Sequence, residues 1–308
     1  MTKKILVIGS SNTDVLIQVP HMPKVGETVL GGKCHIACGG KGANQAVAAK
    51  RSGGAVKFIA CVGDDAFGKM ALESYAKDGI DISKISVLAG EPTGLAQIMV
   101  DSAGHNLIAV APEANLLLTP EVVAKAHEEI ENCDILLLQL EVPLESVLTA
   151  IDLAFAAQKT IILNPAPAQI IPEHYLAKLD YITPNETEAE ILTGINVSDE
   201  QSAATAAQWF LSRGVKNVII TLGARGVYFA NANSSQLVTG FKVNALDTTG
   251  AGDTFNGGFV TALSLGEDEI SAIRYGQKTA AISVTRLGTQ TSMPYRDEIL
   301  TTTLTENN

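Results

Sequence analysis

Short apolar runs alternate with helix-like segments over most of this 308-residue chain. The apolar runs are rich in Ile, Val and Leu and fall at Ile5–Ile8, Val56–Cys61, Ile135–Gln139, Thr160–Leu163, Tyr181–Thr183 and Val218–Thr221. The helical patterns between them fall at Ala43–Arg51, Phe67–Asp78, Pro120–Glu131, Leu144–Ala157 and Ala203–Arg213. Buried strands that alternate with helices are typical of a parallel sheet covered on both faces. We therefore predict an α/β fold with a mostly parallel central sheet.

Two regions interrupt this alternation. Asp14–Cys38 carries prolines and glycines that favour extended strands with turns, and Leu95–Val110 has the pattern of a hairpin with its turn at 101–104. We predict one domain over residues 1–308, with a small β-sheet lid formed by about 14–38 and 95–110. A small sheet is marginally stable alone. The lid is therefore expected to pack on the lid of a second subunit, giving a homodimer, or else on its own domain.

Composition and charge exclude several classes of protein. The net charge of −11 argues against nucleic acid and anionic membranes as main partners. No apolar run reaches the length of a membrane span, and the first residues enter a strand rather than a signal peptide. The cysteines are too few and scattered for a disulfide framework or a zinc site, so we expect a reduced, cytoplasmic protein. The Thr- and Asn-rich end, Thr301–Asn308, is expected to be frayed.

The glycine-rich segment Asp247–Phe255 reads DTTGAGDTF and precedes an apolar, helix-like stretch. A Gly-Ala-Gly turn can expose consecutive backbone N–H groups, and a helix that begins there adds its positive dipole end. Asp253 stands at the mouth of this anion site, where its carboxylate could accept a proton from an attacking hydroxyl. The segment points to phosphoryl transfer from a nucleotide to an alcohol, with a structural helix cap as the alternative.

Two segments near the amino terminus suit a polyhydroxylated ligand. Asn12 and Asp14 follow the first strand at its carboxyl end, where α/β sheets bind ligands, although both residue types also favour turns. Gly39–Asn44 opens a helix but fits neither the Walker A nor the dinucleotide fingerprint. Its glycines let a ligand approach the backbone, and Asn44 offers a donor and an acceptor. A helix cap explains the same glycines equally well.

Further polar residues follow later strands. Glu141 is placed for a substrate hydroxyl or for a helix N-terminus. Asn185 and Glu188, three apart, suit water-mediated contact with Mg²⁺ or a helix cap. The Gly turn Thr221–Gly226 could follow nucleotide phosphates. Because the carboxyl ends of parallel strands share one edge, these residues are expected to converge. The acidic chain would need local helix N-termini, a few cations and a divalent metal to bind ATP.

Together these motifs resemble a known family. Three segments are similar to the signatures of the ribokinase family of carbohydrate kinases, in matching order and spacing: Cys38–Ala46, Asn185–Glu188 and Asp247–Phe255. The likeness extends from about Ile5 to Pro294. Within the family, bacterial members are resembled most closely at Gly9–Asp14, Asn164–Ala168 and Thr183–Glu190. The resemblance implies a ribokinase-like fold with a β-sheet lid.

The resemblance also implies transfer of the ATP γ-phosphoryl group to O5 of D-ribose, giving ribose 5-phosphate. Asp253 would be the general base, and the amides of Gly250, Ala251 and Gly252 would form the anion hole. The sugar would lie against Asn12, Thr13, Asp14, Gly40, Lys41, Gly42, Ala43, Asn44, Glu141 and Asp253. ATP would lie against Asn185, Thr221, Leu222, Gly223, Ala224, Arg225, Gly226, Gly252, Asp253 and Gln277, the last replacing a His or Asn common near the adenine.

Two metal sites follow from the same resemblance. Mg²⁺ would lie near Asn185 and Glu188. A monovalent cation, usually K⁺, would be held, partly through backbone carbonyls, by a loop containing Asp247, Thr249, Ser283, Arg286, Gly288 and Ser292. This cation would order the loop that carries the anion hole.

Three other functions remain as alternatives. A kinase of another sugar or nucleoside, such as deoxyribose, fructose or adenosine, differs only in a few pocket side chains. A non-catalytic sugar-binding regulator is disfavoured because Asp253 and the complete Gly-Ala-Gly turn are present. An NAD-dependent dehydrogenase is disfavoured because the first strand lacks its glycine fingerprint.

Overall fold

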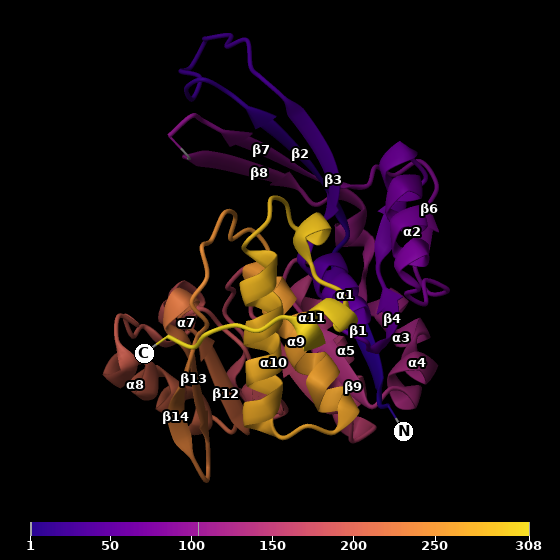
Figure 1. Ribbon diagram of the computed structural model, residues 1–308. Coiled ribbons are helices and arrows are strands. Elements are labelled where there is room, and N and C mark those ends of the chain that lie inside the picture. The colour runs from indigo at the N-terminus through magenta and orange to yellow at the C-terminus, as the bar shows by residue number, and fades with distance from the viewer. Residues whose placement is uncertain (1, 104, 308) are drawn as a thin grey trace.

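A sheet of eight strands forms the centre of the computed structural model, which describes residues 2–103 and 105–307 (Figure 1). The strand order is β14-β13-β12-β11-β10-β9-β1-β4. The bounds are β1 Lys4–Ile8, β4 Ala55–Ile59, β9 Ile135–Leu138, β10 Thr160–Leu163, β11 Tyr181–Ile182, β12 Asn217–Thr221, β13 Gly226–Asn231 and β14 Ser235–Thr239. Pairing is parallel from β4 to β12 and antiparallel from β12 to β14. The predicted mostly parallel sheet is confirmed.

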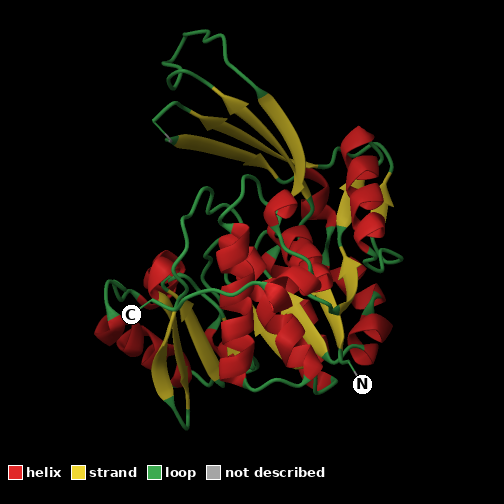
Figure 2. Cartoon of the chain, viewed as in Figure 1, coloured by secondary structure: helices red, strands yellow, loops and turns green. Residues whose placement is uncertain are grey.

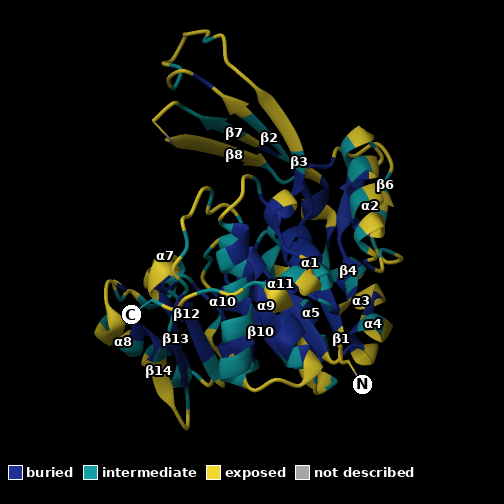
Figure 3. Cartoon of the chain, in the orientation of Figure 1, coloured by how far each residue is buried: buried dark blue, intermediate teal, exposed yellow. Residues whose placement is uncertain are grey.

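Helices cover both faces of this sheet (Figure 2). One face carries α1 Lys41–Arg51, α2 Ala66–Asp78, α9 Ala251–Leu265 and α10 Glu269–Ser283. The other carries α3 Pro120–Lys125, α4 His127–Asn132, α5 Leu144–Ala156, α7 Glu186–Thr193 and α8 Glu200–Leu211. Along β9, Ile135 and Leu137 join the first core while Leu136 and Leu138 join the second, which explains the continuous apolar runs. Figure 3 shows this buried centre in dark blue.

A second sheet stands apart from the helical body (Figures 1 and 2). Its order is β3-β2-β7-β8, from strands β2 Asn12–Gln18, β3 Cys34–Gly39, β7 Gly94–Val100 and β8 Asn106–Ala111. The predicted small separate sheet is therefore confirmed, and both predicted segments contribute to it. Gly104, in the predicted hairpin turn, lies outside the described residues. We call this sheet the lid.

Two predicted elements are each divided in the structure. The helix expected at Pro120–Glu131 is two helices that meet at Ala126, where tighter three-residue hydrogen bonds replace the helical ladder. The strand expected at Val56–Cys61 ends at Ile59, and β5 Cys61–Gly63 pairs instead with β6 Ser86–Leu88. The remaining short elements are α6 Glu173–Leu176, α11 Arg296–Thr301, and the 3₁₀ turns η1 Glu113–Leu117, η2 Gly223–Arg225 and η3 Gln290–Ser292. Among the described residues, no helix has the length and apolar character needed to cross a membrane.

Close helix packing brings α1 and α9 together above the sheet edge. A Cβ at Gly42 would lie 2.6 Å from the backbone of Gly9, so only glycine lets α1 begin against the loop after β1. A Cβ at Gly257 would lie 2.4 Å from the Ala48 Cβ, where α9 crosses α1. These two approaches place the start of α9 beside the first turns of α1.

Candidate active site

Asp253 lies in the first turn of α9 and faces α1. Its carboxylate accepts two amide hydrogen bonds, from Asn44 Nδ2 to Oδ2 and from Gln45 Nε2 to Oδ1, each at 2.9 Å. The residue is 7% exposed. Burial raises the pKa of Asp253 above its usual value, while the Lys41 ammonium and the two amides favour the charged form. The carboxylate is thus oriented from both oxygens and is poised to accept a proton.

The start of α9 provides an anion site. Gly250, the N-cap, has φ 71° and caps the helix with no side chain. The Ala251 amide donates to the Thr248 carbonyl at 3.1 Å. Within residues 2–103 and 105–307, the amides of Gly250, Gly252 and Asp253 have no hydrogen-bond acceptor. These amides and the positive end of a 15-residue helix can bind an anion.

A layer of side-chain amides supports Asp253 from below. Gln45 Nε2 also donates to Asn164 Oδ1 at 2.9 Å, and Gln45 Oε1 accepts from Gln139 Nε2 at 2.6 Å. Asn164 Nδ2 in turn donates to the Thr183 carbonyl at 2.9 Å. Gln45, Gln139 and Asn164 were not predicted as site residues. A signal was present, because Gln139 and Asn164 are polar residues directly after buried strands.

Glu141 and Lys41 join the sheet edge to the start of α1. Glu141 Oε2 accepts from the Lys41 amide at 2.9 Å and from Ser10 Oγ at 2.5 Å. Of the two roles expected for Glu141, a contact with a substrate hydroxyl and a contact with a helix N-terminus, the structure shows the second. Burial alone would lower the pKa of Lys41, but the carboxylates of Asp253, Glu141, Glu188 and Asp14 outweigh it and raise that pKa. Lys41 is thus a charged ammonium among carboxylates.

Asp14 faces the same carboxylate cluster from the lid. A Cβ at Gly39 would lie 2.3 Å from Asp14 Oδ1, so the carboxylate rests directly on the glycine backbone of β3. Burial, with the charges of Glu141 and Asp253, raises the pKa of Asp14 to about 6, although Lys41 opposes this. The predicted sugar residues Asp14, Lys41, Glu141 and Asp253 are thus brought together.

Asn12 is held by a residue that the sequence did not predict. Asn115 Nδ2 donates to Asn12 Oδ1 at 2.7 Å, and Asn115 Oδ1 accepts from the Ser11 amide at 2.8 Å. Gly40, the N-cap of α1, has φ 87° and packs against the Asn12 amide. The other predicted sugar residues, Thr13, Gly42, Ala43 and Asn44, lie in β2 or in the first turn of α1. The hydroxyl of Thr13 is buried without a partner among the described residues.

A cavity of about 400 Å³ adjoins the start of α9. Its lining includes Asn185, Thr221, Gly223, Ala224, Gly226, Gly252 and Gln277, all predicted to contact ATP. Of the other predicted residues, Leu222 is buried and is not part of this lining. Arg225 turns outward, with Nη2 3.1 Å from Glu186 Oε1 and Nη1 2.5 Å from the Ser198 carbonyl. A second hollow of about 400 Å³ lies around Lys4, Lys57 and Asp81. It is near the amino ends of β1 and β4, whereas the residues predicted to bind ligands follow the carboxyl ends of the strands.

Gln277 carries a free acceptor beside this cavity. Its Nε2 donates to the Val238 carbonyl at 2.8 Å, which fixes the amide orientation. Its Oε1 is buried and has no partner among the described residues. The side chain can therefore accept one hydrogen bond from an amino group.

The carboxyl-terminal segment forms part of the cavity wall. The backbone amide of Asn307 donates to the Gly240 carbonyl at 2.8 Å, and its side-chain Nδ2 donates to the Ala224 carbonyl at 2.6 Å. The Lys242 amide donates to the Thr305 carbonyl at 2.8 Å. The expectation of a frayed end is wrong for residues 305–307, because this segment pairs with the strand-like backbone at 240–242. Asn308 lies outside the described residues.

Asn185 and Glu188 form a capping box at the start of α7. The Glu188 amide donates to Asn185 Oδ1 at 2.8 Å, and the Asn185 amide donates to Glu188 Oε2 at 2.9 Å. Burial raises the pKa of Glu188. Among the described residues, no group of three His, Cys, Asp or Glu side chains could hold a metal ion. The amide and carboxylate of these two residues suit contact with Mg²⁺ through its water ligands.

Asp247 links the two segments of the predicted cation loop. Its Oδ1 accepts from the Thr249 amide and its Oδ2 from the Gly288 amide, each at 2.9 Å. Burial opposes ionisation of Asp247, but these hydrogen bonds lower its pKa. The Arg286 guanidinium pairs with Glu298, so only its carbonyl is available to the loop. Ser283 and Ser292 are buried, with hydroxyls bonded to local carbonyls. Carboxylate, hydroxyl and carbonyl oxygens are suitable ligands for a hard monovalent cation.

The chain is similar to known proteins over nearly its whole length. A family model described as pfkB family carbohydrate kinase matches residues 2–296. The chain is 50% identical to a ribokinase of Haemophilus influenzae, covering 97% of this chain and 98% of the relative. It is 38% identical to a deoxyribokinase of Salmonella typhi, covering 94% and 95% of the two chains. The solved structure of an Arabidopsis thaliana ribokinase complexed with ribose and ATP matches with TM-score 0.91 and 31% identity, covering 97% and 98%.

Proposed function

Because this chain belongs to the pfkB family of carbohydrate kinases, we propose that it transfers the γ-phosphoryl group of ATP to O5 of D-ribose. One observation carries the proposal. The carboxylate of Asp253 is held by Asn44 and Gln45 beside the free amides at the start of α9, between the sugar-side residues and the cavity. The identity with the Haemophilus ribokinase supports ribose as the sugar.

In this reaction the Asp253 carboxylate takes the proton of the ribose 5-hydroxyl. The O5–phosphorus bond forms as the bond between the γ-phosphorus and the ADP oxygen breaks, in line. The free amides of Gly250 and Gly252 and the α9 dipole stabilise charge on the transferred group. The predicted contribution of the Ala251 amide would require it to leave Thr248. Lys41 offsets negative charge on the sugar side.

The cavity residues would hold the nucleotide. Gly223, Gly226 and Gly252 allow the phosphates and the ribose moiety of the nucleotide to approach the backbone closely. The free Oε1 of Gln277 suits the amino group of adenine. The Asn185–Glu188 box would contact Mg²⁺ through water, and Mg²⁺ would neutralise phosphate charge. The Asp247 loop would hold K⁺ and thereby keep the anion site ordered.

The replacement Asp253→Asn tests the base. It keeps the side-chain shape but removes the proton acceptor, so kcat should fall about 10²- to 10⁴-fold. ATP affinity, measured by calorimetry, should change by less than about twofold, because Asp253 does not line the cavity. Asp268→Asn is the matched control, since Asp268 only caps α10. A kcat near that of the wild type in Asp253→Asn would overturn the base assignment.

The similarity to a deoxyribokinase makes deoxyribose the second candidate substrate. A coupled ADP-release assay over ribose, deoxyribose, fructose and adenosine distinguishes the candidates. We expect the highest kcat/KM for ribose, because the polar groups of Asn12, Asp14 and Asn44 would be left unpaired by a missing hydroxyl. A higher value for deoxyribose would reassign the substrate.

We also propose assembly as a homodimer through the lid, and a cytoplasmic location. Exposed apolar side chains on one face of the lid, Ile108 and Val110, support the dimer. All four cysteines are free, which suits a reducing compartment.

A further inference from the structure

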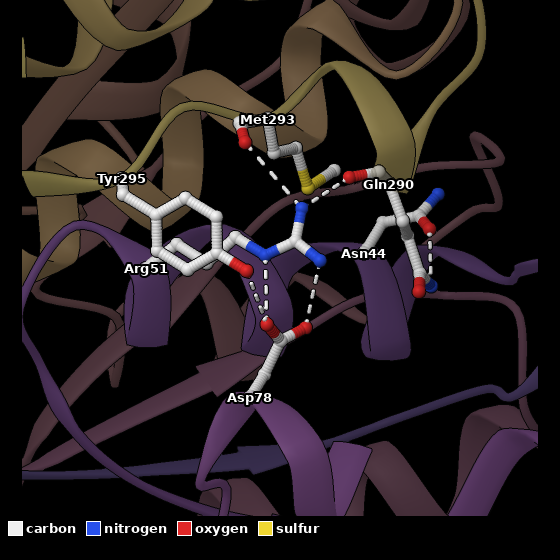
Figure 4. Close-up of polar contacts among 6 residues, drawn as sticks. All are labelled: Asn44, Arg51, Asp78, Gln290, Met293 and Tyr295. Atoms are coloured by element: carbon white, nitrogen blue, oxygen red, sulfur yellow. Dashed lines mark hydrogen bonds and ion pairs between the residues drawn. The ribbon is translucent and has the colours of Figure 1, made fainter. Parts of the chain in front are cut away.

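The segment from Gln290 to Tyr295, to which the proposed reaction assigns no role apart from Ser292 in the cation loop, contacts α1 at two points (Figure 4). One contact is at Arg51, the last residue of α1, and the other is at Asn44, seven residues earlier on the same face. Gln290 takes part in both, through its carbonyl at Arg51 and through its side chain at Asn44.

Arg51 anchors this segment to two helices. Its Nε and Nη2 donate to Asp78 Oδ1 and Oδ2 at 3.0 and 2.8 Å, a bidentate pair at the end of α2. The side chains of Arg51 and Asp78 are only 13% and 4% exposed. Tyr295 donates its hydroxyl to Asp78 Oδ1 at 3.0 Å, and its ring lies 5.0 Å from the Arg51 guanidinium carbon. The remaining guanidinium nitrogen, Nη1, donates to the Gln290 carbonyl. A buried, bidentate pair of this kind fixes the backbone of Gln290.

The Gln290 side chain then sets the orientation of Asn44. Gln290 Nε2 donates to Asn44 Oδ1 at 3.0 Å, and Asn44 Nδ2 donates to Asp253 Oδ2 at 2.9 Å. An asparagine amide has a donor end and an acceptor end of nearly the same shape. A flipped Asn44 would turn its oxygen toward the Asp253 carboxylate and its NH₂ group toward the Gln290 NH₂ group. Both contacts are repulsive, so the donor from Gln290 favours the orientation in which Asn44 donates to Asp253.

We propose that Gln290 is a positioning residue for the reaction: it holds the Asn44 amide toward Asp253, and the Arg51–Asp78 pair holds Gln290. This inference rests on the proposed role of Asp253 as base. Without Gln290, Asn44 would rotate freely, and one of the two hydrogen bonds that stabilise the charged carboxylate would be populated only part of the time. The carboxylate would then be less well aimed and harder to ionise.

The replacement Gln290→Met tests the proposal, since it keeps the length of the side chain and the carbonyl that Arg51 uses. We expect kcat to fall about tenfold, the equivalent of one lost hydrogen bond near a charge. The acid limb of kcat/KM for ribose against pH should move up by about one unit, since that hydrogen bond favours the charged form of Asp253. A loss of stability alone would not move this limb. The KM for ATP should stay within about twofold.

Thr291→Val is the matched control, because Thr291 is exposed in the same segment and its hydroxyl, within residues 2–103 and 105–307, bonds only to the Leu287 carbonyl. Arg51→Lys is a second variant, in case Gln290→Met folds poorly. It removes the bidentate pair while keeping the charge, and we expect the same direction of change in the acid limb, with a smaller size.

Three outcomes distinguish the positioning role of Gln290 from the role of Asp253 as general base. A shifted acid limb in Gln290→Met and Arg51→Lys, with Thr291→Val unchanged, supports the positioning role. A wild-type kcat and acid limb in folded Gln290→Met, while Asp253→Asn is inactive, overturns the positioning role and leaves the base intact. Full activity in Asp253→Asn overturns the proposed base, and with it the reason for the inference.

Discussion

Asp14 shows that a residue placed for binding can reduce the stability of the fold. Its pKa is raised from 3.8 to about 6 by burial and by the charges of Glu141 and Asp253. For an acid with a raised pKa, the folded state binds the proton more tightly than the unfolded state. The stability that this provides is complete below about pH 4 and is lost as the pH rises through 6. At neutral pH the protein therefore folds against an unfavourable charge.

The replacement Asp14→Asn should stabilise the protein at pH 7. We expect the free energy of unfolding to rise by about 2 to 3 kcal/mol at pH 7, and the gain to vanish below about pH 4. Denaturant unfolding at the two pH values measures this. Asp297→Asn, on the exposed side of α11, is the control. An equal gain at both pH values would show that charge is not the cause. Ribose affinity should fall in the same variant, as is common when a stabilising change removes a binding group.

At the scale of elements, the tail shows what local pattern cannot reveal. Strands such as β9 and β10 were predicted because apolar runs report burial directly. Residues 305–307 are polar and pair with 240–242, a partner about sixty-five residues away that no local pattern identifies. The same reason explains why Gln45, Asn115 and Gln290 were missed, since their roles arise from partners on distant segments. The glycine-rich turn of α9, by contrast, carries its geometry within its own sequence.

The tail should contribute to nucleotide binding. Asn307 joins the Gly240 and Ala224 walls of the cavity, and Asn307→Ala removes the side-chain bond to the Ala224 carbonyl while keeping the backbone bond to Gly240. We expect KM for ATP to rise about three- to tenfold, the effect of one lost hydrogen bond, with KM for ribose unchanged. Steady-state kinetics with each substrate varied measures this. Asn233→Ala, in the exposed turn between β13 and β14, is the matched control. Equal increases for both substrates would instead indicate a general loosening of the site.

At the scale of the whole molecule, much of the lid is exposed (Figure 3), and large apolar side chains are among its exposed residues. The strand register places Asp14 in a row with Ala96 and Val110, and Leu16 in a row with Ile98 and Ile108. Residues that pair across neighbouring strands point to the same face of the sheet, and so do residues two apart along one strand. Asp14 and these apolar side chains therefore lie on one face of the lid. Ile108 is 58% exposed and Val110 47% exposed. The sequence predicted the lid from its two segments, but not the extent of this face, which depends on register.

The replacement Ile108→Lys should separate the proposed dimer. A charge in the middle of an apolar contact is not compensated there, so we expect a monomer by light scattering at micromolar concentrations, where the wild type is a dimer. Ile170→Lys, at a position 84% exposed outside the lid, is the control. A wild type that is monomeric, or an Ile108→Lys variant that stays dimeric, would show that the lid face has another role.

The position of Asp14 on the lid links the affinity for ribose to the concentration of the enzyme. The lid face that carries Asp14 also carries the apolar side chains that a second chain would cover. If assembly steadies the lid, then by mass action sugar occupancy and assembly must promote each other. Half-saturation by ribose would then shift to higher sugar concentration as the enzyme is diluted below its dimer Kd. A cell that makes more of this protein would obtain more sites and also a higher affinity at each of them.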